Sequence, residues 1–171
     1  MTITACTLPA HALLVRYSEQ GAYTDCFSTE LPHAVSFERY VSAFYNSLPF
    51  KLERMILKLA MGLPSSDAQA SELALGQRDR FAAWKVEARA DQQLLLTDVL
   101  GSTRSWLMLE SVDAPSPRTR LYFGSAVIAR RNARTGETSM GTSYRLLLGF
   151  HKLYSRILLS AARRRLVRAT P

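Results

Sequence analysis

Three side chains in this sequence have types and settings that suit acid–base chemistry: His151, Asp25 and Asp98. His151 lies within an apolar helical pattern, and an imidazole titrates near neutral pH, so in a pocket it would serve as an acid or base. The alternative is a core histidine that is hydrogen-bonded to a sheet hydroxyl or carbonyl. Asp25 lies between Tyr23 and Phe27 in an alternating segment, where it is either a solvent-facing strand residue or a buried acceptor.

Asp98 belongs to a second group of residues, at the end of an apolar strand pattern. A tight turn centred on Gly101 would place Asp98 opposite Arg104 on the next strand. The same register would place Leu96 opposite Trp106. The charged pair is then either a solvated cross-strand ion pair or a group at a cavity mouth that orients a polar ligand. Trp106 and the other aromatic residues of this region are expected in the core rather than around a cofactor.

Motifs for metal, phosphate or nucleophilic chemistry are missing from the sequence. It contains no glycine-rich phosphate loop, no G-x-S-x-G and no H-E-x-x-H. His11, His33 and His151 are too scattered to predict a metal site from spacing. Two cysteines, Cys6 and Cys26, are too few for a disulfide framework, and we expect both as free thiols in a reducing compartment. We expect neither a metal nor a cofactor.

Positive charge is concentrated near the end of the chain. Residues 143–171 hold seven basic residues and no acidic ones, so +7 of the formal net charge of +8 lies there. Positive charge at the C-terminal end of a helix is favoured by the helix dipole without any ligand. The alternative is an interaction module, in which this basic helix meets nucleic acid or an anionic membrane surface.

Length and hydropathy predict a single cytoplasmic domain. A chain of 171 residues can bury a sizeable core, so residues 1–171 are expected to form one domain, with residues 1–11 and 168–171 as loose ends. No stretch approaches the roughly 20 apolar residues of a membrane span, and no secretory segment is evident near Leu13–Val15.

The first half of the sequence predicts strands followed by helices. Ala12–Tyr17 reads as a short strand, and Ala22–Ser28 as a strand with Tyr23, Asp25 and Phe27 on one side. Helices are expected over Phe37–Tyr45, from Ser47 to Gly62, and from Ser66 to Gly76. The buried face of the second helix is expected to carry Phe50, Leu52, Met55, Ile56 and Leu59.

The second half predicts an antiparallel meander and a long closing helix. Strand patterns cover residues 79–90, 93–100, 103–112 and 119–129, with short connections between them. The last helix is expected from Ser143 to Leu166. Its inner face is expected to carry two merged apolar stripes, formed by Leu146, Phe150, Leu153, Ile157, Leu147, His151, Tyr154 and Leu158.

This order of elements resembles the helix-grip fold of the START-like and polyketide-cyclase-like (SRPBCC) superfamily. More narrowly, it is similar to a bacterial domain family of unknown function near that superfamily. The resemblance covers most of residues 22–165. It rests on the Tyr-x-Asp-x-Phe strand, the apolar two-helix block that runs to Gly62-Leu63, and the segments DRFAAWKVEA, LLLTDVLGSTRSWLML, RLYFGSAV and LLLGFHKLYSRILL. It implies an α+β fold, with a curved antiparallel sheet wrapped around the last helix.

A long helix across a curved sheet leaves a gap that suits a small apolar molecule. We therefore expect the protein to bind a hydrophobic or aromatic small molecule there. The alternative is a cofactor-independent cyclase or dehydratase. A homodimer through an apolar strand edge, at residues 22–28 or 119–129, is a further expectation. The predicted ligand-binding residues are His151, Leu147, Tyr154, Asp98, Arg104, Trp106, Tyr23 and Asp25.

Overall fold

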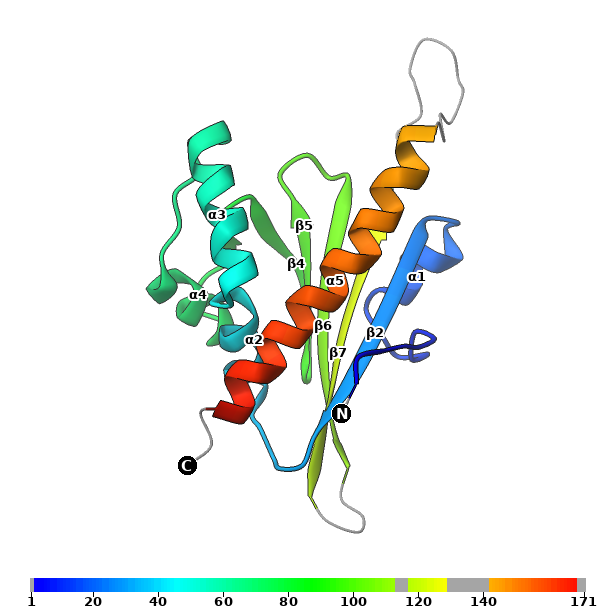
Figure 1. Ribbon diagram of the computed structural model, residues 1–171, viewed down its shortest axis with the longest axis vertical. Helices are drawn as coiled ribbons and strands as arrows, with labels where there is room; N and C mark the ends of the chain where they lie inside the picture. The colour runs from blue at the N-terminus through cyan, green and yellow to red at the C-terminus, as the bar shows by residue number, and fades with distance from the viewer. Residues whose placement is uncertain (1, 113–116, 129–141, 169–171) are drawn as a thin grey trace.

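One antiparallel sheet organises the molecule (Figure 1). The computed structural model describes residues 2–112, 117–128 and 142–168, and for residues 60, 61 and 142–151 it describes the backbone alone. Within these residues seven strands pair in the order β1-β2-β7-β6-β5-β4-β3. The strands are β1 (Thr4–Ala5), β2 (Tyr23–Leu31), β3 (Arg80–Phe81), β4 (Trp84–Ala90), β5 (Gln93–Asp98), β6 (Thr103–Val112) and β7 (Arg118–Val127).

Helices cover the two faces of this sheet unequally. The described helices are α1 (Val15–Glu19), α2 (Phe37–Tyr45), α3 (Leu48–Met61), α4 (Asp67–Ala74) and α5 (Thr142–Arg168). The larger core lies between the sheet and α2, α4 and α5, where Phe44 packs against Phe123 with ring centroids 4.7 Å apart. A smaller core on the opposite face holds Leu14, Tyr17 and Trp106 beneath α1 and the loop before it. The structure therefore confirms an α+β fold with an antiparallel sheet and a long C-terminal helix.

Helix α2 follows its sequence pattern closely. The Ser36 hydroxyl accepts a hydrogen bond from the Arg39 backbone N–H and so caps the first turn. Tyr40, Val41 and Phe44 fall on the buried side, as predicted. The Tyr40 hydroxyl donates to the Tyr122 carbonyl at 2.9 Å, which ties the helix to β7. Helix α4 also begins as predicted, with a capping box between Ser66 and Gln69.

The predicted strand over residues 79–90 is a hairpin. Strands β3 and β4 pair Phe81 with Trp84, so the chain reverses at Ala82, which adopts a positive φ of 52°. An irregularity between Val86 and Ala88 then shifts the register of β4 on β5. Trp84 and Val86 pack on the large core, whereas Ala88 packs on the small core. The alternating pattern of residues 79–90 predicts all three on one face, and this prediction is wrong because the bulge inserts a residue that a period of two does not anticipate.

The β5–β6 turn differs from its prediction by one residue. Thr97 pairs with Arg104, so Asp98 and Arg104 lie on opposite faces of the sheet and the predicted cross-strand ion pair is wrong. Asp98 instead accepts hydrogen bonds from the Ser102 backbone N–H at 2.7 Å and from the Thr103 hydroxyl at 3.0 Å. The carboxylate therefore closes a loop that is one residue shorter than a turn centred on Gly101 would give.

The N-terminal segment also departs from the prediction. The apolar run Ala12–Tyr17 is not a strand, because its second half enters α1, and Leu14 and Tyr17 cover the outer face of the sheet. So short an apolar run does not distinguish the two structures by periodicity. Residues 1–11 are not wholly loose either, since β1 pairs with β2 and the Cys6 N–H donates to the Cys26 carbonyl at 3.0 Å.

Helix α5 lies along β2 and β7, and it also contacts α2 and α3 (Figure 1). Its described inner face carries Ser155, Leu158, Leu159, Ala162 and Leu166, with Tyr154 partly buried. The prediction of one broad inner stripe is half wrong, because Leu153 and Ile157 are exposed. At about 100° per residue, both side chains lie more than a quarter turn away from the inner face of the helix. Helical spacing alone therefore assigned two apolar residues to the wrong face.

Helix α3 shows the largest departure. Phe50 is buried as predicted, but Leu52, Met55, Ile56 and Leu59 are all exposed. The side of α3 that packs inward carries Phe50, Glu53 and Arg54, which places the aliphatic stripe on the outside. Arg54 is held there by Ser65 and Asp67, at 2.9 Å from Ser65 Oγ and 2.8 Å from Asp67 Oδ1.

Gly124 on β7 lies close to two neighbouring strands and to the segment before α1. A Cβ atom there would lie 2.8 Å from the Asp25 carbonyl oxygen, 2.9 Å from the Trp106 ring and 3.0 Å from Leu14. The absence of a side chain therefore lets β2 and Trp106 close on β7.

The strand edges bear on the predicted homodimer. Residues 119–129 were predicted as an exposed edge, but β7 lies between β2 and β6 and has no free edge. The edge of β2 is covered by β1 at Phe27 and Ser28. In the described part of the chain, no helix has the length and hydropathy to cross a membrane.

Candidate functional site

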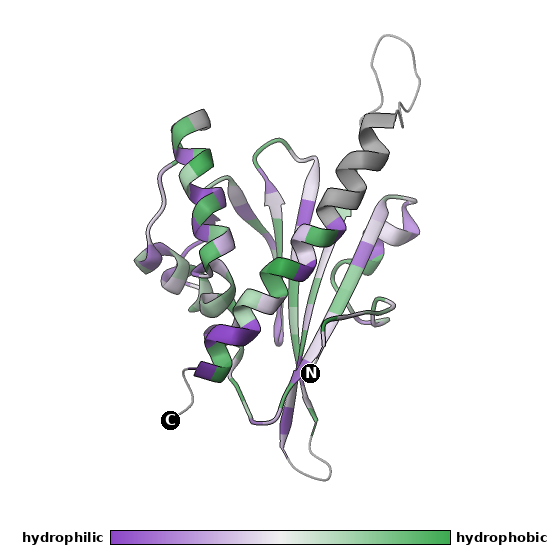
Figure 2. Cartoon of the chain, viewed as in Figure 1, coloured by the Kyte–Doolittle hydropathy of each residue, from purple (hydrophilic) through white to green (hydrophobic). Residues whose placement is uncertain are grey.

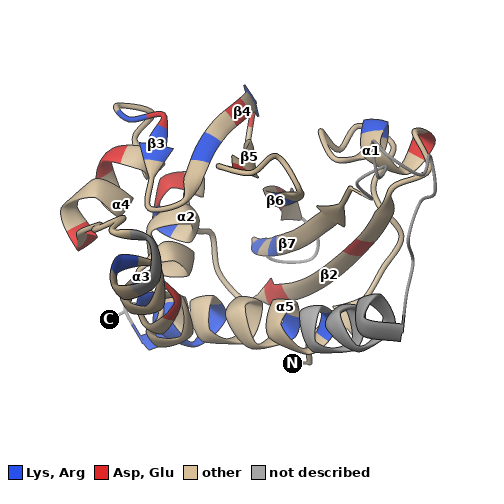
Figure 3. Cartoon of the chain, turned by 90° about the horizontal axis from the view of Figure 1, so that it is seen from above, with Lys and Arg blue, Asp and Glu red and all other residues tan. Residues whose placement is uncertain are grey.

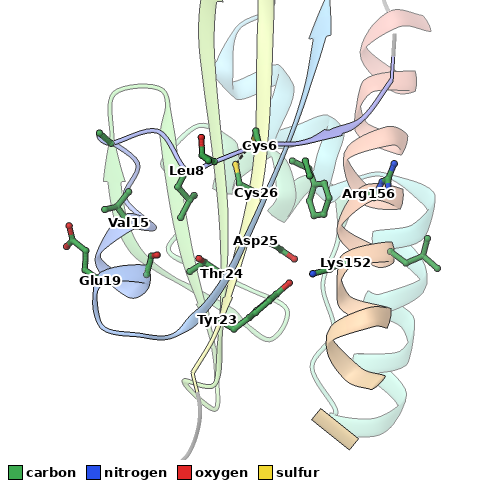
Figure 4. A pocket seen from close by; sticks show the side chains of 16 residues that line it. Cys6, Leu8, Val15, Glu19, Tyr23, Thr24, Asp25, Cys26, Lys152 and Arg156 are labelled. Carbon is green, nitrogen blue, oxygen red and sulfur yellow. Dashed lines mark hydrogen bonds between the residues drawn. The ribbon is translucent and has the colours of Figure 1, made fainter. Parts of the chain in front are cut away.

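A groove runs along the edge of β2 beside α5 (Figure 4). Its volume is about 900 Å³, and we call it the β2–α5 groove. Four segments contribute to it: the N-terminal arm, α1, β2 and α5. Its lining consists of Ala5, Cys6, Thr7, Leu8, Ala10, Val15, Ser18, Glu19, Tyr23, Thr24, Asp25, Cys26, Phe27, Lys152, Leu153 and Arg156.

Strand β2 gives the groove two chemically different sides. Phe27 packs on the large core and Cys26 on the small core, which confirms the predicted alternation of this strand. Tyr23 and Asp25 extend toward α5, whereas Leu8 and Val15 lie on the other side of the strand (Figure 4). Because β1 pairs with β2 at Phe27 and Ser28, the described strands leave the start of β2 open to the groove.

Asp25 is held in place from the neighbouring strand. Its Oδ1 atom accepts the Ser125 backbone N–H at 3.0 Å and the Ser125 hydroxyl at 2.5 Å. Asp25 is buried, at 9% exposure, and it still contributes to the groove lining. The carboxylate is therefore a fixed acceptor in the wall rather than a mobile surface charge.

Two cations stand on the α5 side of the groove. Lys152 and Arg156 are one helical turn apart, and both side chains are exposed. Lys152 Nζ lies 5.8 Å from the centroid of the Tyr23 ring, within range of a cation–π contact. Arg156 also donates a long hydrogen bond of 3.4 Å to the Ile3 carbonyl. The pair is placed to hold an anionic group at the open side of the groove.

A pair of thiols lines the same groove. Cys6 Sγ and Cys26 Sγ are 3.1 Å apart, and both cysteines are free thiols, as predicted. Hydrogen bonding from the Cys26 thiol lowers the pKa of Cys6 to about 7. The same hydrogen bond, together with burial, raises the pKa of Cys26. Cys6 is therefore the more acidic and more accessible thiol of the two.

Tyr154 lies in a different cluster from Tyr23 and Asp25. Its hydroxyl donates to Glu53 on α3, and the Trp84 indole N–H donates to the same carboxylate at 3.3 Å. Burial raises the pKa of Glu53, although these two donors act in the opposite direction. Burial and the neighbouring Glu53 carboxylate also raise the pKa of Tyr154. The cluster joins α3, β4 and α5 and does not line the β2–α5 groove.

The remaining described residues of the predicted site lie elsewhere. Arg104 faces away from α5, where its Nε donates to the Tyr17 hydroxyl at 2.8 Å and lies 2.5 Å from Glu87. Trp106 is fully buried on that same outer face, and its indole donates to Gln93 at 3.0 Å. Asp98 closes the β5–β6 turn. The alternative of an Asp98–Arg104 pair at a cavity mouth is wrong, because the register of β5 on β6 puts the two side chains on opposite faces. Trp106 lies in the core, as expected, and does not line the groove.

The backbone of His151 and Leu147 lies in α5, but their side chains are outside the described residues. Lys152, Arg156 and Cys6 are groove residues absent from the predicted site. The spacing of Lys152 and Arg156, four apart on one helix face, was the available signal for a paired cation. Cys6 had no comparable signal, since its pairing with Cys26 depends on how the N-terminal arm folds back.

The groove offers no obvious metal centre. In the described part of the chain, no group of three or more His, Cys, Asp or Glu side chains is arranged to hold a metal ion. A scan against protein-family models, a search of curated proteins and a search of solved structures each found no match. The function is therefore argued from the geometry of the groove.

Proposed function

We propose that this protein binds an amphipathic small molecule in the β2–α5 groove. The molecule would have an apolar or aromatic body and an anionic head such as a carboxylate. The observation that supports this most directly is a groove of about 900 Å³ with apolar walls and two cations at one side. Sites for small molecules commonly have volumes of roughly 300–1,000 Å³ and a few placed polar groups.

A helix-grip type of fold is part of the same proposal. Its support is the sheet order, in which β2 lies beside the last strand β7, and the packing of α5 along both. Helices α2 and α3 follow β2 at the place of the two-helix block on which the resemblance rests, and the short helix α4 follows them. The groove differs in position from the gap expected beneath the middle of the last helix. It lies instead at the edge of the sheet, because large side chains such as Phe44 and Phe123 fill the centre.

The chemistry of the walls orients the proposed ligand. Leu8, Val15 and Phe27 offer apolar surface, which would take the body of the molecule. Lys152 and Arg156 would take its anionic head, because charge-assisted hydrogen bonds are stronger than neutral ones. Asp25 would disfavour a head placed against β2, since a fixed carboxylate repels an anion.

Calorimetric titration with dodecanoate and with dodecanol tests this proposal. Both probes carry the same chain, so the difference between them isolates the anionic head. We expect dodecanoate to bind more tightly than dodecanol. Lys152→Met should weaken dodecanoate binding by about tenfold, which corresponds to about 1.4 kcal/mol, and should leave dodecanol unchanged.

Lys85→Met is the matched control for that variant. Lys85 is an exposed lysine on β4, outside the groove, so its replacement removes the same charge elsewhere. If both variants lose the same affinity for dodecanoate, the loss follows from net charge alone, and a specific role for Lys152 is contradicted. Absence of any heat or melting shift with either probe would contradict ligand binding itself.

A cofactor-independent cyclase or dehydratase in the same groove is a second proposal. The observation that favours it is the position of Asp25, a buried carboxylate in the groove wall that extends toward α5 (Figure 4). Asp98 is engaged in its turn and lies outside the groove. Asp25→Asn keeps the acceptor for Ser125 and removes the titratable group. An enzyme should lose turnover in this variant, whereas a binding protein should keep or gain affinity for dodecanoate.

A further inference from the structure

An aliphatic ridge runs along the solvent side of α3. Its members are Leu48, Leu52, Met55, Ile56 and Leu59, which are 80%, 54%, 52%, 55% and 79% exposed. At about 100° per residue these five positions fall within one stripe, opposite the buried side chains of Phe50 and Arg54. We call this stripe the α3 ridge. Contiguous apolar surface of this kind on a folded chain marks an interaction site.

The outward face of α5 continues the surface. Leu153 and Ile157 are exposed on it, and Arg164 and Arg168 follow further along the helix. A hollow of about 810 Å³ lies where α5 passes the start of α3, and Leu48, Ile157 and Arg164 contribute to its lining. Figure 3 shows α3 and the C-terminal end of α5 on the same side of the sheet.

The charges around this surface are mostly positive, although Glu38 of α2 lines a neighbouring hollow together with Arg165 and Arg168. Arg164, Arg165 and Arg168 take part in none of the ion pairs found among the described residues. The described residues that line the hollow include no Asp or Glu. Glu53, the one acid of α3, turns inward to Tyr154 and Trp84. Figure 2 shows apolar bands along α3 and a hydrophilic C-terminal end of α5.

We propose that the α3 ridge and the arginines of α5 dock this protein on an anionic lipid membrane. Helix α3 would lie in the plane of the interface with the ridge among the acyl chains, as amphipathic interfacial helices do. Arg164, Arg165 and Arg168 would contact lipid phosphates, which attract basic residues near the surface. The inference does not depend on the β2–α5 groove.

The combination of an apolar ridge and a cationic helix end on one surface distinguishes between the possible binding partners. A second copy of the chain would bury the ridge but would bring two clusters of arginines together. Nucleic acid would satisfy the arginines but leave five aliphatic side chains in water, because its backbone offers phosphate and little apolar surface. An anionic bilayer satisfies both, since it presents phosphates above hydrocarbon.

Co-sedimentation of the full chain with lipid vesicles tests the proposal. Vesicles of phosphatidylcholine alone are compared with vesicles that also contain about a quarter phosphatidylglycerol. We expect binding to the anionic vesicles that falls as salt is raised, and little binding to the neutral ones. Leu52→Glu with Ile56→Glu should reduce binding to the anionic vesicles by at least about tenfold, since each change places a charge in the acyl region.

Val99→Glu with Leu100→Glu is the matched control. These two residues are 54% and 61% exposed on the β5–β6 turn, so this variant adds the same two charges to equally exposed aliphatic positions. Both double variants should melt near the parent temperature, because neither pair belongs to a buried core cluster. The control should keep most of the vesicle binding of the parent.

A second pair of variants examines the arginines. Arg164→Gln with Arg168→Gln should weaken binding to the anionic vesicles by about thirtyfold, since each basic residue near the surface contributes roughly 1 kcal/mol. Arg80→Gln with Lys85→Gln removes two exposed charges from β3 and β4 and should change it far less.

Three results would overturn membrane docking. The first is a failure of the parent protein to bind anionic vesicles. The second is equal binding by the ridge variant and its control on the β5–β6 turn. The third is a dimer, seen by sedimentation, that Leu52→Glu with Ile56→Glu converts to monomer, since the ridge would then be covered by a second copy.

Discussion

Helices α2 and α3 follow each other in the chain and carry similar apolar patterns, but they end in opposite settings. Tyr40, Val41 and Phe44 of α2 are fully buried between α5 and the sheet. Leu52, Ile56 and Leu59 of α3 face solvent. The two helices therefore teach that helical spacing identifies an apolar stripe but not the surface that covers it.

The difference arises from what holds each helix. Helix α2 is attached by packing, with Phe44 in contact with the rings of Tyr40, Tyr45, Phe50 and Phe123. Helix α3 is attached at its start by Phe50 and along its length by the polar side chains of Arg54 and Glu53. The attachment of α3 uses its polar side, which leaves its aliphatic side available.

The largest effect should come from the packed helix. Phe44→Ala removes a fully buried ring and should lower the free energy of unfolding by about 3–5 kcal/mol. The matched change on α3, Leu59→Ala, should cost under about 0.5 kcal/mol because Leu59 is exposed. Urea unfolding measures both. A comparable loss in the two variants would mean that the α3 ridge is covered in solution.

A middle-sized effect should come from the polar attachment of α3. Arg54 is buried and its guanidinium bonds to Ser65 and Asp67, so Arg54→Met should cost about 2 kcal/mol. Lys51 contacts the same Asp67 at the surface, and Lys51→Met should cost under about 1 kcal/mol. If the order of the two losses were reversed, α3 would not depend on the buried guanidinium.

The subtlest effect concerns pH. Burial raises the pKa of Glu53, so the folded chain holds this proton to higher pH than the unfolded chain does. The contribution of the neutral carboxyl is complete below the ordinary glutamate pKa of about 4.3 and is lost as pH rises through the folded value. Glu53→Gln removes this dependence. Its unfolding free energy, relative to the parent, should therefore rise with pH from about 4 and then level off.

Urea titrations of both proteins at several pH values provide that measurement. If the difference in unfolding free energy between the variant and the parent does not change with pH, Glu53 ionises as easily in the folded chain as in the unfolded chain. In that case both polar contacts of α3, at Glu53 and at Arg54, would be made by charged groups, and its contrast with the packed helix α2 would be larger.

Much of the sheet was predictable because its signals are local. Gly101, with the strongly apolar run before it and the strand pattern after it, locates β5 and β6, and the cap at Ser36 locates α2. The faces of β2 followed from the alternation of Phe27 and Cys26. The basic terminal segment was predicted as a helix from Ser143 to Leu166, and α5 spans Thr142–Arg168.

The errors share a cause, which is information that lies outside each segment. The β5–β6 connection is one residue shorter than predicted, which puts Arg104 on the opposite face from Asp98, and a bulge moves Ala88 to the opposite face from Val86. The outward direction of the α3 ridge depends on Ser65 and Asp67, which lie after the helix. Two residues of the predicted site, Tyr23 and Asp25, do line the groove. They could be predicted because the alternation of their strand is a local signal.

The bare backbone at Gly124 carries a consequence for anyone who screens random variants. A methyl group there would collide with the main chain at Asp25 and with the indole of Trp106, neither of which can yield cheaply. A library scored for lost ligand capture would therefore flag position 124 as strongly as a genuine contact residue, although no ligand would touch it. A substitution found at this position should be interpreted as a distortion of the sheet and not as the loss of a ligand contact.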